Sequence, residues 1–511
     1  MRKGLAAIVL FGALAAPAHA ARVAVLVVDP FDPAAYAGRG AVGLFVPGSG
    51  ENVSRRAALA SLVRGQVEPS TLGGVPGGKP VISLASRPGP ITIYVALPPA
   101  GTHANTRRYP IAIVGGGYDG ILVSRSTRIR GLVSIGDIAP SARALSQGRR
   151  PVIRPRADKR AVAHLARLDL RLTRNHDVRL WATLILVGSV LGGALLAVGL
   201  RSRYVARAGL LAAPGVLAAS LVLSALAVSR PHLVVPLLAG LTIGGSLLVA
   251  APPRLLPYAL IALVAAYLVV FSAWPTVNSL AAIGARPDGG GRFYGAGNLV
   301  ETVLLTVSLE AAALLGRRAV PAVLVLALVT VGWSKAGADG GGIVVLLAAF
   351  AVLAVRIYDV RLTVRRVVAA VGAGCVLIAA IVGLDAATGG SSHVTRAIGK
   401  GPVSLAGELG HRIHISAASI GSNWHAATVF GVSIAALAVL GTRPPRFAAG
   451  EALLAGIAIS LLVNDSPVDV ASAGALSYSV LWAYERVREP PQAFARADSV
   501  RLDGPSVSPR A

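Results

Sequence analysis

The sequence predicts a polytopic α-helical membrane bundle of about eleven spans, preceded by an extracytoplasmic α/β domain. Three observations favour this fold class. Of 511 residues, 54% are hydrophobic and only 14% are charged, whereas soluble domains carry roughly a quarter charged residues. Long apolar runs follow one another from residue 180 onward. Before them, short β-branched runs alternate with helical patterns and Gly/Pro turns.

The charge and cysteine content exclude several classes of protein. The formal net charge is +26 at pH 7, which in a soluble protein would suggest nucleic acid. In a chain this apolar, we expect arginine-rich loops beside a membrane and no nucleic-acid partner. The single cysteine, Cys375, lies inside an apolar run, so no internal disulfide can form. No cofactor and no metal site are predicted.

Residues 1–20, MRKGLAAIVLFGALAAPAHA, combine a basic start, an apolar stretch and an Ala-His-Ala ending. This pattern predicts a secretory signal peptide, with an uncleaved membrane anchor as the alternative. Either one places the following residues outside the cytoplasm. Residues 21–150 then form the predicted α/β domain. Its strand candidates RVAVLVVD, GPITIYVAL, YPIAIVGGG and GILVS alternate with the helical stretch SRRAALASLVRG, which suggests a parallel sheet.

Four segments of this domain resemble the alkaline-phosphatase-type α/β fold: RVAVLVVD, RGAVGLFVPGSG, SRRAALASLVRG and ILVSRSTRIRGLVSIGDIAPSA. The resemblance implies a metal-binding role for Asp29 and a nucleophile at Ser54. The family's Asp-His-Gly metal motif is replaced here by IAIVGGGYDG, which has no histidine. A working two-metal site needs several Asp and His ligands, so the resemblance implies a degenerate, non-catalytic relative.

Residues 151–179 form a basic amphipathic linker. Val162, Leu165, Leu168 and Leu172 recur at helical spacing between arginines. Such a helix can lie on a membrane surface, or it can pack on the soluble domain. The sequence leaves both alternatives open.

The polytopic domain covers residues 180–485, and a disordered cytoplasmic tail covers 486–511. Each apolar run is near the length needed to cross ~30 Å of hydrocarbon. The predicted spans are 180–200, 204–228, 232–252, 255–275, 298–316, 319–335, 341–357, 366–385, 425–441, 447–464 and 470–485.

Arginine-rich loops set the predicted orientation in a bacterial plasma membrane. Short basic loops such as 316–318, 356–366 and 442–446 are expected in the cytoplasm. The basic segment before residue 180 favours the opposite orientation, but the later basic loops are more numerous and decide the prediction. This topology places GGRFYGAGN, SKAGADGGG, the loop 386–425 and NDSPVDVAS on the outer face.

These outer segments carry the predicted site. Glycines allow close backbone approach and free N–H groups bind anions, and GADGGG opens a helix whose N-terminus favours negative charge. The alternative is that the glycines only make tight turns. The predicted substrate-binding residues are Arg292, Tyr294, Gly295, Gly297, Asn298, Lys335, Gly340, Gly341, Arg396, Arg412, Asn423 and Asn464.

The candidate catalytic groups are carboxylates and histidines. Ionisable residues at membrane depth are costly and usually functional, which singles out Asp339 and Asp465. Glu301 and Glu310 occupy similar positions, and Glu310 is the deeper and stronger candidate of the two. The loop 386–425 supplies histidines for general acid/base work, with a zinc site and a solvated loop as alternatives. These histidines are His411, His414 and His425.

The membrane half resembles a family of uncharacterised bacterial polytopic proteins marked by RFYGxGNE, GANxGG, SHxGR and NDSG. Here these motifs stand as RFYGAGNL, GADGGG, SHVTRA and NDSP. Leu299 therefore replaces a glutamate, Asp339 an asparagine and Pro467 a glycine. The resemblance implies that some members also carry a degenerate phosphatase-like domain, but it implies no activity.

The sequence thus predicts an outward-facing polar site. The first hypothesis is an enzyme that acts on a polyprenyl-phosphate-linked or other lipid-linked glycan, with membrane lipid as its partner. The second is a transporter or flippase for an anionic or lipid substrate, and the third is a non-catalytic envelope-assembly partner. The depth of the glycine motifs in the membrane distinguishes the enzyme from the transporter, because motifs halfway into the bundle favour transport. The oligomeric state is not predicted.

Overall fold

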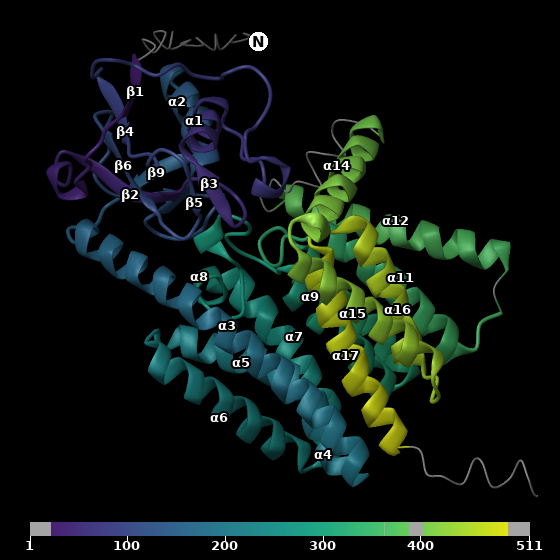
Figure 1. The fold of residues 1–511 in the computed structure, drawn as a ribbon. Helices are drawn as coiled ribbons and strands as arrows, with labels where there is room; N and C mark the ends of the chain where they lie inside the picture. Colours follow the sequence, from purple (N-terminus) through teal and green to yellow (C-terminus); the bar gives the residue numbers. More distant parts are fainter. Residues whose placement is uncertain (1–21, 362, 388–401, 489–511) are drawn as a thin grey trace, which may run out of the picture.

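A computed structural model describes residues 22–361, 363–387 and 402–488. An α/β domain and a helical bundle are joined by one long helix, α3 (Ala161–Leu200) (Figure 1). At 1.5 Å per residue, its 40 residues extend for about 60 Å. The predicted signal peptide, and the predicted tail beyond Arg488, lie outside the described residues.

The domain is built on a seven-stranded sheet with the order β1-β4-β6-β2-β7-β9, and β8 also pairs with β2. β2 is buried along its whole length, as expected for an apolar central strand. A separate two-stranded sheet pairs β3 (Asn52–Ser54) with β5 (Thr102–Ala104). The strands of the large sheet are β1 (Val23–Val27), β2 (Gly40–Val46), β4 (Ile91–Val95), β6 (Tyr109–Val114), β7 (Gly120–Ser124), β8 (Leu132–Ser134) and β9 (Ile153–Arg156).

The predicted parallel sheet is wrong in part, because the sheet is mixed. β1 runs parallel to β4, and β2 parallel to β7 and β8, but β6 is antiparallel to both β4 and β2. A parallel pair needs a long crossover, usually a helix, whereas an antiparallel neighbour does not. The described domain has two α-helices before α3, α1 (Arg55–Arg64) and α2 (Ile138–Ser146), too few to cross over every strand.

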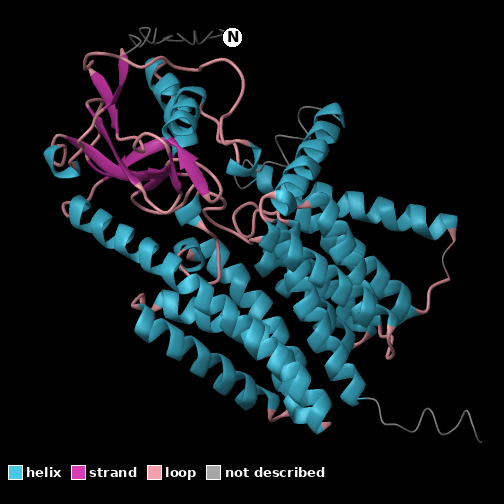
Figure 2. Ribbon diagram, in the orientation of Figure 1, coloured by secondary structure: helices cyan, strands magenta, loops and turns pink. Residues whose placement is uncertain are grey.

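The two faces of the sheet are covered by different helices (Figure 2). Leu62 of α1 and Ile138 of α2 join the core on one face. Leu165, Leu168 and Leu172 of α3 join the core on the other face. The helix therefore packs on the domain, and the membrane-surface alternative for residues 151–179 is wrong, because the sheet buries its apolar side.

The bundle contains each of the eleven apolar runs as helix. Seven described helices are long and apolar enough to cross a membrane, or up to eight if the bent pair α4 and α5 forms one span. The expected eleven spans exceed this count. Besides α3, the helices are α4 (Arg203–Leu210), α5 (Ala212–Ala225), α6 (Pro231–Ala250), α7 (Leu256–Ala273), α8 (Pro275–Ser279), α9 (Asn298–Leu315), α10 (Val320–Gly332), α11 (Gly340–Tyr358), α12 (Val364–Ala387), α14 (Pro402–Gly421), α15 (Trp424–Thr442), α16 (Ala448–Val463) and α17 (Pro467–Arg488).

The two ends of the bundle differ in composition. The domain lies at one end, next to the segment that precedes α9 (Figure 1). Basic loops gather at the other end, where Arg317 donates to the carbonyl of Ile357 and Arg207 to that of Ala250. The predicted separation of basic loops from glycine-rich motifs is therefore present in the fold.

Candidate functional site

Three motif segments far apart in the sequence meet at the domain-side end of the bundle. RFYGAGN precedes α9, GADGGG opens α11, and NDSP connects α16 to α17. α9 packs against α11, α16 and α17, and α11 against α16. Because α9 and α11 begin where α16 ends, their termini form one cluster of polar groups.

An ion pair holds the first two segments together. The Arg292 guanidinium donates to Asp339 Oδ2 at 2.9 Å and also donates to the carbonyl of Ala296. The other carboxylate oxygen, Asp339 Oδ1, accepts the N–H of Gly342 at 3.1 Å and caps the N-terminus of α11. Asp339 is buried, with 4% of its side chain exposed, while 37% of the Arg292 side chain is exposed.

Glu301 lies in the first turn of α9 and is 2% exposed. Its Oε2 accepts from Asn464 Nδ2 at 3.2 Å, and the same amide donates to Ser460 Oγ at 2.7 Å. Glu301 Oε1 is buried without a hydrogen-bond partner among the described residues. A buried polar atom without a partner is costly, so Glu301 is the candidate in the cluster for exchanging a proton or taking a ligand.

Two glycines allow the α11 backbone to approach these side chains. A Cβ on Gly341 would lie 2.6 Å from Asn464 Oδ1, and one on Gly342 would lie 2.5 Å from Val331 Cγ1 and 3.1 Å from Glu301 Oε1. Both distances below 3 Å are closer than a real Cβ tolerates. The glycines of GADGGG therefore make room for the cluster, in addition to starting a helix.

The RFYGAGN segment divides its contacts between the bundle and the domain. Asn298 donates to Asp465 at 3.3 Å on the exposed rim of the cluster. Gly295 has a φ of +81° and passes so close to Gly337 that a Cβ would lie 2.1 Å from its carbonyl oxygen. Tyr294 lies under the guanidinium of Arg128 from the domain, and the carbonyl of Gly297 accepts the N–H of Glu301.

The predicted histidines do not join this cluster. His411, His414 and His425 are exposed, and no described hydrogen bond or ion pair links them to the cluster. The ring of His425 instead stacks on Trp424. The predicted loop is wrong for these residues, since His411 and His414 lie on α14 and His425 lies on α15, and only the packing of the two helices decides which groups they face.

Other predicted substrate-binding residues have structural partners or lie elsewhere. Arg412 Nη1 donates to the carbonyl of Val463 at 2.9 Å, which ties α14 to the end of α16. Asn423 caps α15 by accepting the N–H of Ala426. Gly340 is the first residue of α11, Lys335 is exposed, and Arg396 lies outside the described residues.

Glu301 is the site residue that sequence reasoning undervalued. Depth along the apolar run favoured Glu310, and the family motif directed attention to position 299, where this chain has leucine. A usable signal was available, since Glu301 is the first acidic residue after RFYGAGN and lies one turn into the helix. Asn464, which donates to Glu301, lies 163 residues further along the chain. No local sequence pattern relates the two residues.

The charges in the cluster argue against the anion-binding site that was predicted at GADGGG. The N-terminus of α11 already holds a carboxylate, that of Asp339, and the same carboxylate neutralises Arg292. An anion at this helix end would compete with the protein's own group. Lys335 and the exposed part of Arg292 remain available for an anionic substrate.

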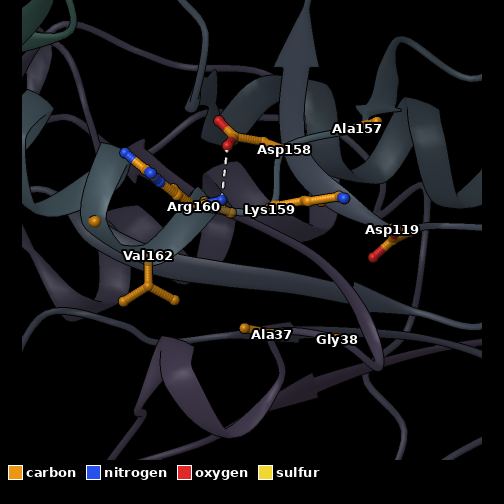
Figure 3. Close-up of a pocket in the computed structure, with 11 residues that line it drawn as sticks. Ala37, Gly38, Asp119, Ala157, Asp158, Lys159, Arg160 and Val162 are labelled. Atoms are coloured by element: carbon orange, nitrogen blue, oxygen red, sulfur yellow. Dashed lines mark hydrogen bonds between the residues drawn. The ribbon is translucent and has the colours of Figure 1, made fainter.

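The surface of the domain carries a hollow (Figure 3) whose lining includes no residue of this cluster. It is lined by residues such as Asp119, Lys159 and Arg160 at the start of α3. Its most buried acid, Asp158, is already paired with Arg130 at 2.7 Å. The hollow contains none of the motif residues.

The residues suggested by the phosphatase resemblance have ordinary structural contacts. Ser54 Oγ accepts the N–H of Ala57 and caps α1, and the exposed Asp29 lies 4.0 Å from Arg55. Within the described ranges, no three His, Cys, Asp or Glu side chains are grouped to hold a metal ion.

Comparisons of the chain with protein-family models, with curated proteins and with solved structures return no match. The two family resemblances therefore stay predictions.

Proposed function

We propose that this protein is a bacterial plasma-membrane enzyme that acts at the outer face on an anionic, lipid-linked substrate, such as a polyprenyl-phosphate-linked glycan. Glu301 is the group that moves the proton. The observation that carries the proposal is the buried Glu301 carboxyl, with one oxygen bound by Asn464 and the other without a partner. General acids and bases are commonly carboxyls held in this way by their surroundings.

The depth of the cluster supports an enzyme over a transporter. α9 has 18 residues and α11 has 19, so each extends about 27–29 Å from the cluster. This is close to the ~30 Å hydrocarbon core, which supports a position of the cluster near one membrane surface over one at the midplane. The headgroup and first phosphate of a lipid-linked substrate lie at that level.

The chemistry follows from the placement of charges. The carboxylate of Glu301 would take the proton from an attacking hydroxyl group as the new bond forms to the glycan. The lipid phosphate would leave with the bonding electrons, and Lys335 and the exposed part of Arg292 would stabilise its charge. Arg292 also fixes Asp339, so it contributes to the geometry as well as the charge.

The proposal is tested by trapping the substrate. Glu301→Gln keeps the shape of the side chain and cannot act as a base. We expect this variant, purified with its native lipids, to carry one phosphate-containing lipid-linked species that mass spectrometry finds depleted in the unsubstituted protein. Adding the unsubstituted protein should convert that species. Equal lipid content in both proteins, with no conversion, would overturn the proposal.

A transporter is the second candidate, because three connections between helices meet at one acidic cluster. The connections α8–α9, α10–α11 and α16–α17 all lie there, and non-helical backbone beside ionisable groups is common in transport sites. Reconstitution in liposomes separates the two candidates, because a transporter would move the trapped species across the bilayer unchanged.

The side of the membrane is tested by cysteine labelling. In a Cys375→Ala background, single cysteines replace Gly291 and Thr442, both exposed and at opposite ends of the bundle. An impermeant thiol reagent should label intact cells at 291 and not at 442. The reverse pattern would place the site in the cytoplasm and remove envelope substrates from consideration.

A further inference from the structure

One arginine of the α/β domain holds both glycine-rich loops of the site. Arg128 Nη2 donates to the carbonyl of Ser334 at 2.7 Å, and Nη1 to that of Lys335 at 3.1 Å. Its guanidinium carbon lies 3.7 Å from the centre of the Tyr294 ring. Arg128 adopts a φ of +55°, a left-handed conformation that is uncommon for a residue with a side chain. Surrounding contacts must compensate for that conformation.

A hydrogen bond also joins the two loops to each other, and a second one joins the 334–337 loop to α12. The N–H of Ala296 donates to the carbonyl of Gly337 at 3.0 Å, and the N–H of Ser334 donates to Asp385 Oδ1 of α12 at 3.0 Å. The backbone of Ser334 is thus bound at its carbonyl by the domain and at its N–H by α12. Asp339 follows five residues later and meets Arg292, so the position of this loop decides whether that ion pair forms.

Further contacts fasten the domain to the segment before RFYGAGN. Asn105 Nδ2 donates to the carbonyl of Gly289 at 3.0 Å, and the N–H of Gly50 donates to the same oxygen at 3.2 Å. A Cβ on Gly290 would lie 1.9 Å from the carbonyl oxygen of Gly48, so the backbones touch. Phe293 packs into the domain core that α3 also covers.

We propose that the α/β domain is part of the site, and that Arg128 is a positioning residue which holds the 334–337 loop and Tyr294 so that Asp339 meets Arg292. The inference depends on the location of the site and not on its substrate. Its test therefore reads the loop directly, and can fail while the enzyme proposal stands.

The test measures how often the loop opens. In a Cys375→Ala background, Ser334→Cys places a thiol at a buried position, 4% exposed, whose own hydroxyl has no described partner. A maleimide should react slowly with S334C in the purified full-length protein. Adding Arg128→Ala should raise that rate by at least about tenfold, because each charged hydrogen bond lost is worth roughly a factor of ten in an opening equilibrium.

Three comparisons make the result specific. Arg125→Ala removes an exposed arginine from the same turn, has no described contact to lose, and should leave the rate unchanged. Arg128→Lys keeps the charge and should restore part of the protection. A second thiol, Ser308→Cys, is fully buried in α9 and reports global opening, so it should stay slow when Arg128 is replaced.

Two outcomes would overturn the inference. If Arg128→Ala leaves the S334C rate unchanged, the domain does not position the loop. If the S334C and S308C rates rise together, Arg128 supports the whole fold and not the site.

Discussion

α9 carries two buried glutamates, each with an Oε1 that has no hydrogen-bond partner among the described residues, but the two differ in the groups around them. Glu301 is surrounded by Arg292, Asp339 and Asn464, which come from three separate segments. Glu310 is 1% exposed and its Oε1 has no described partner. Its charged neighbours are the Glu485 and Arg488 pair on α17. Depth in an apolar run is therefore the same signal for both carboxyls, and the partners around Glu301 are what favour it under the proposed function.

Ion pairs at the two ends differ in the same way. On the domain side, Asp288 receives two hydrogen bonds from Arg179, at 2.8 Å and 2.7 Å, and is 3% exposed. At the far end, Arg356 and Glu451 pair at 3.0 Å with 48% and 31% of their side chains exposed. Buried pairs fix a geometry, whereas exposed pairs contribute little. The buried pair of Asp288 and Arg179 therefore fixes the geometry at the domain-side end of the bundle.

The largest expected effect separates the two glutamates by function. Glu301→Gln should reduce turnover of the trapped lipid-linked substrate by about 100-fold or more, the usual contribution of a general acid or base. Glu310→Gln makes the same change on the same helix and should retain turnover. Rates measured with the species captured by E301Q provide the comparison. Equal loss in both variants would mean that α9 matters only as structure.

The second prediction compares ion pairs. Arg292→Met leaves the buried Asp339 without its cation and should lower the free energy of unfolding by about 3 kcal/mol. Arg356→Met, at the exposed pair, should cost less than about 1 kcal/mol. The double change Arg292→Met with Asp339→Leu should recover only part of the loss, because it also removes the Asp339 cap of α11. Thermal unfolding in detergent measures all three, and equal costs at the two ends would contradict the comparison.

The third prediction concerns glycines. Gly342→Ala should destabilise by about 1–3 kcal/mol, since its Cβ has no room beside Val331. Gly199→Ala, near the end of α3 with nothing within 4 Å of a Cβ, should be neutral or stabilising by up to about 1 kcal/mol. Unfolding temperatures of the two variants test this, and a neutral Gly342→Ala would mean that the cluster is loosely packed.

The smallest effect is a pH dependence at Asp288. Burial alone would raise the pKa of this carboxyl, but the hydrogen bonds and charge of Arg179, with His176, outweigh burial and lower the pKa below 3.8. The stabilisation is then complete above about pH 4 and is lost as the pH falls through the lowered pKa. Asp288→Asn should flatten the stability profile in this acidic range. An unchanged profile would show that other carboxylates dominate it.

Much of the fold was predictable because hydrophobicity is a local property. All eleven apolar runs are helices, and the α/β domain is present where alternating patterns indicated it. The direction of β6 was not predictable, since both of its neighbours, β4 and β2, are set by long-range pairing. Likewise, Leu165, Leu168 and Leu172 had the spacing of an apolar helix face, and only the sheet showed what that face covers.

By itself the sequence determined an apolar helical part, an α/β part, and three polar motifs at one end of the bundle, two of them glycine-rich. These follow from composition and periodicity, which act residue by residue. Only the tertiary structure decided that Asp339 would neutralise Arg292, and that Asn464 would meet Glu301. It also decided that Arg128 of the domain would hold the loops above them. Each of these contacts joins segments that no pattern relates, because packing, and not sequence distance, sets which polar groups are buried together.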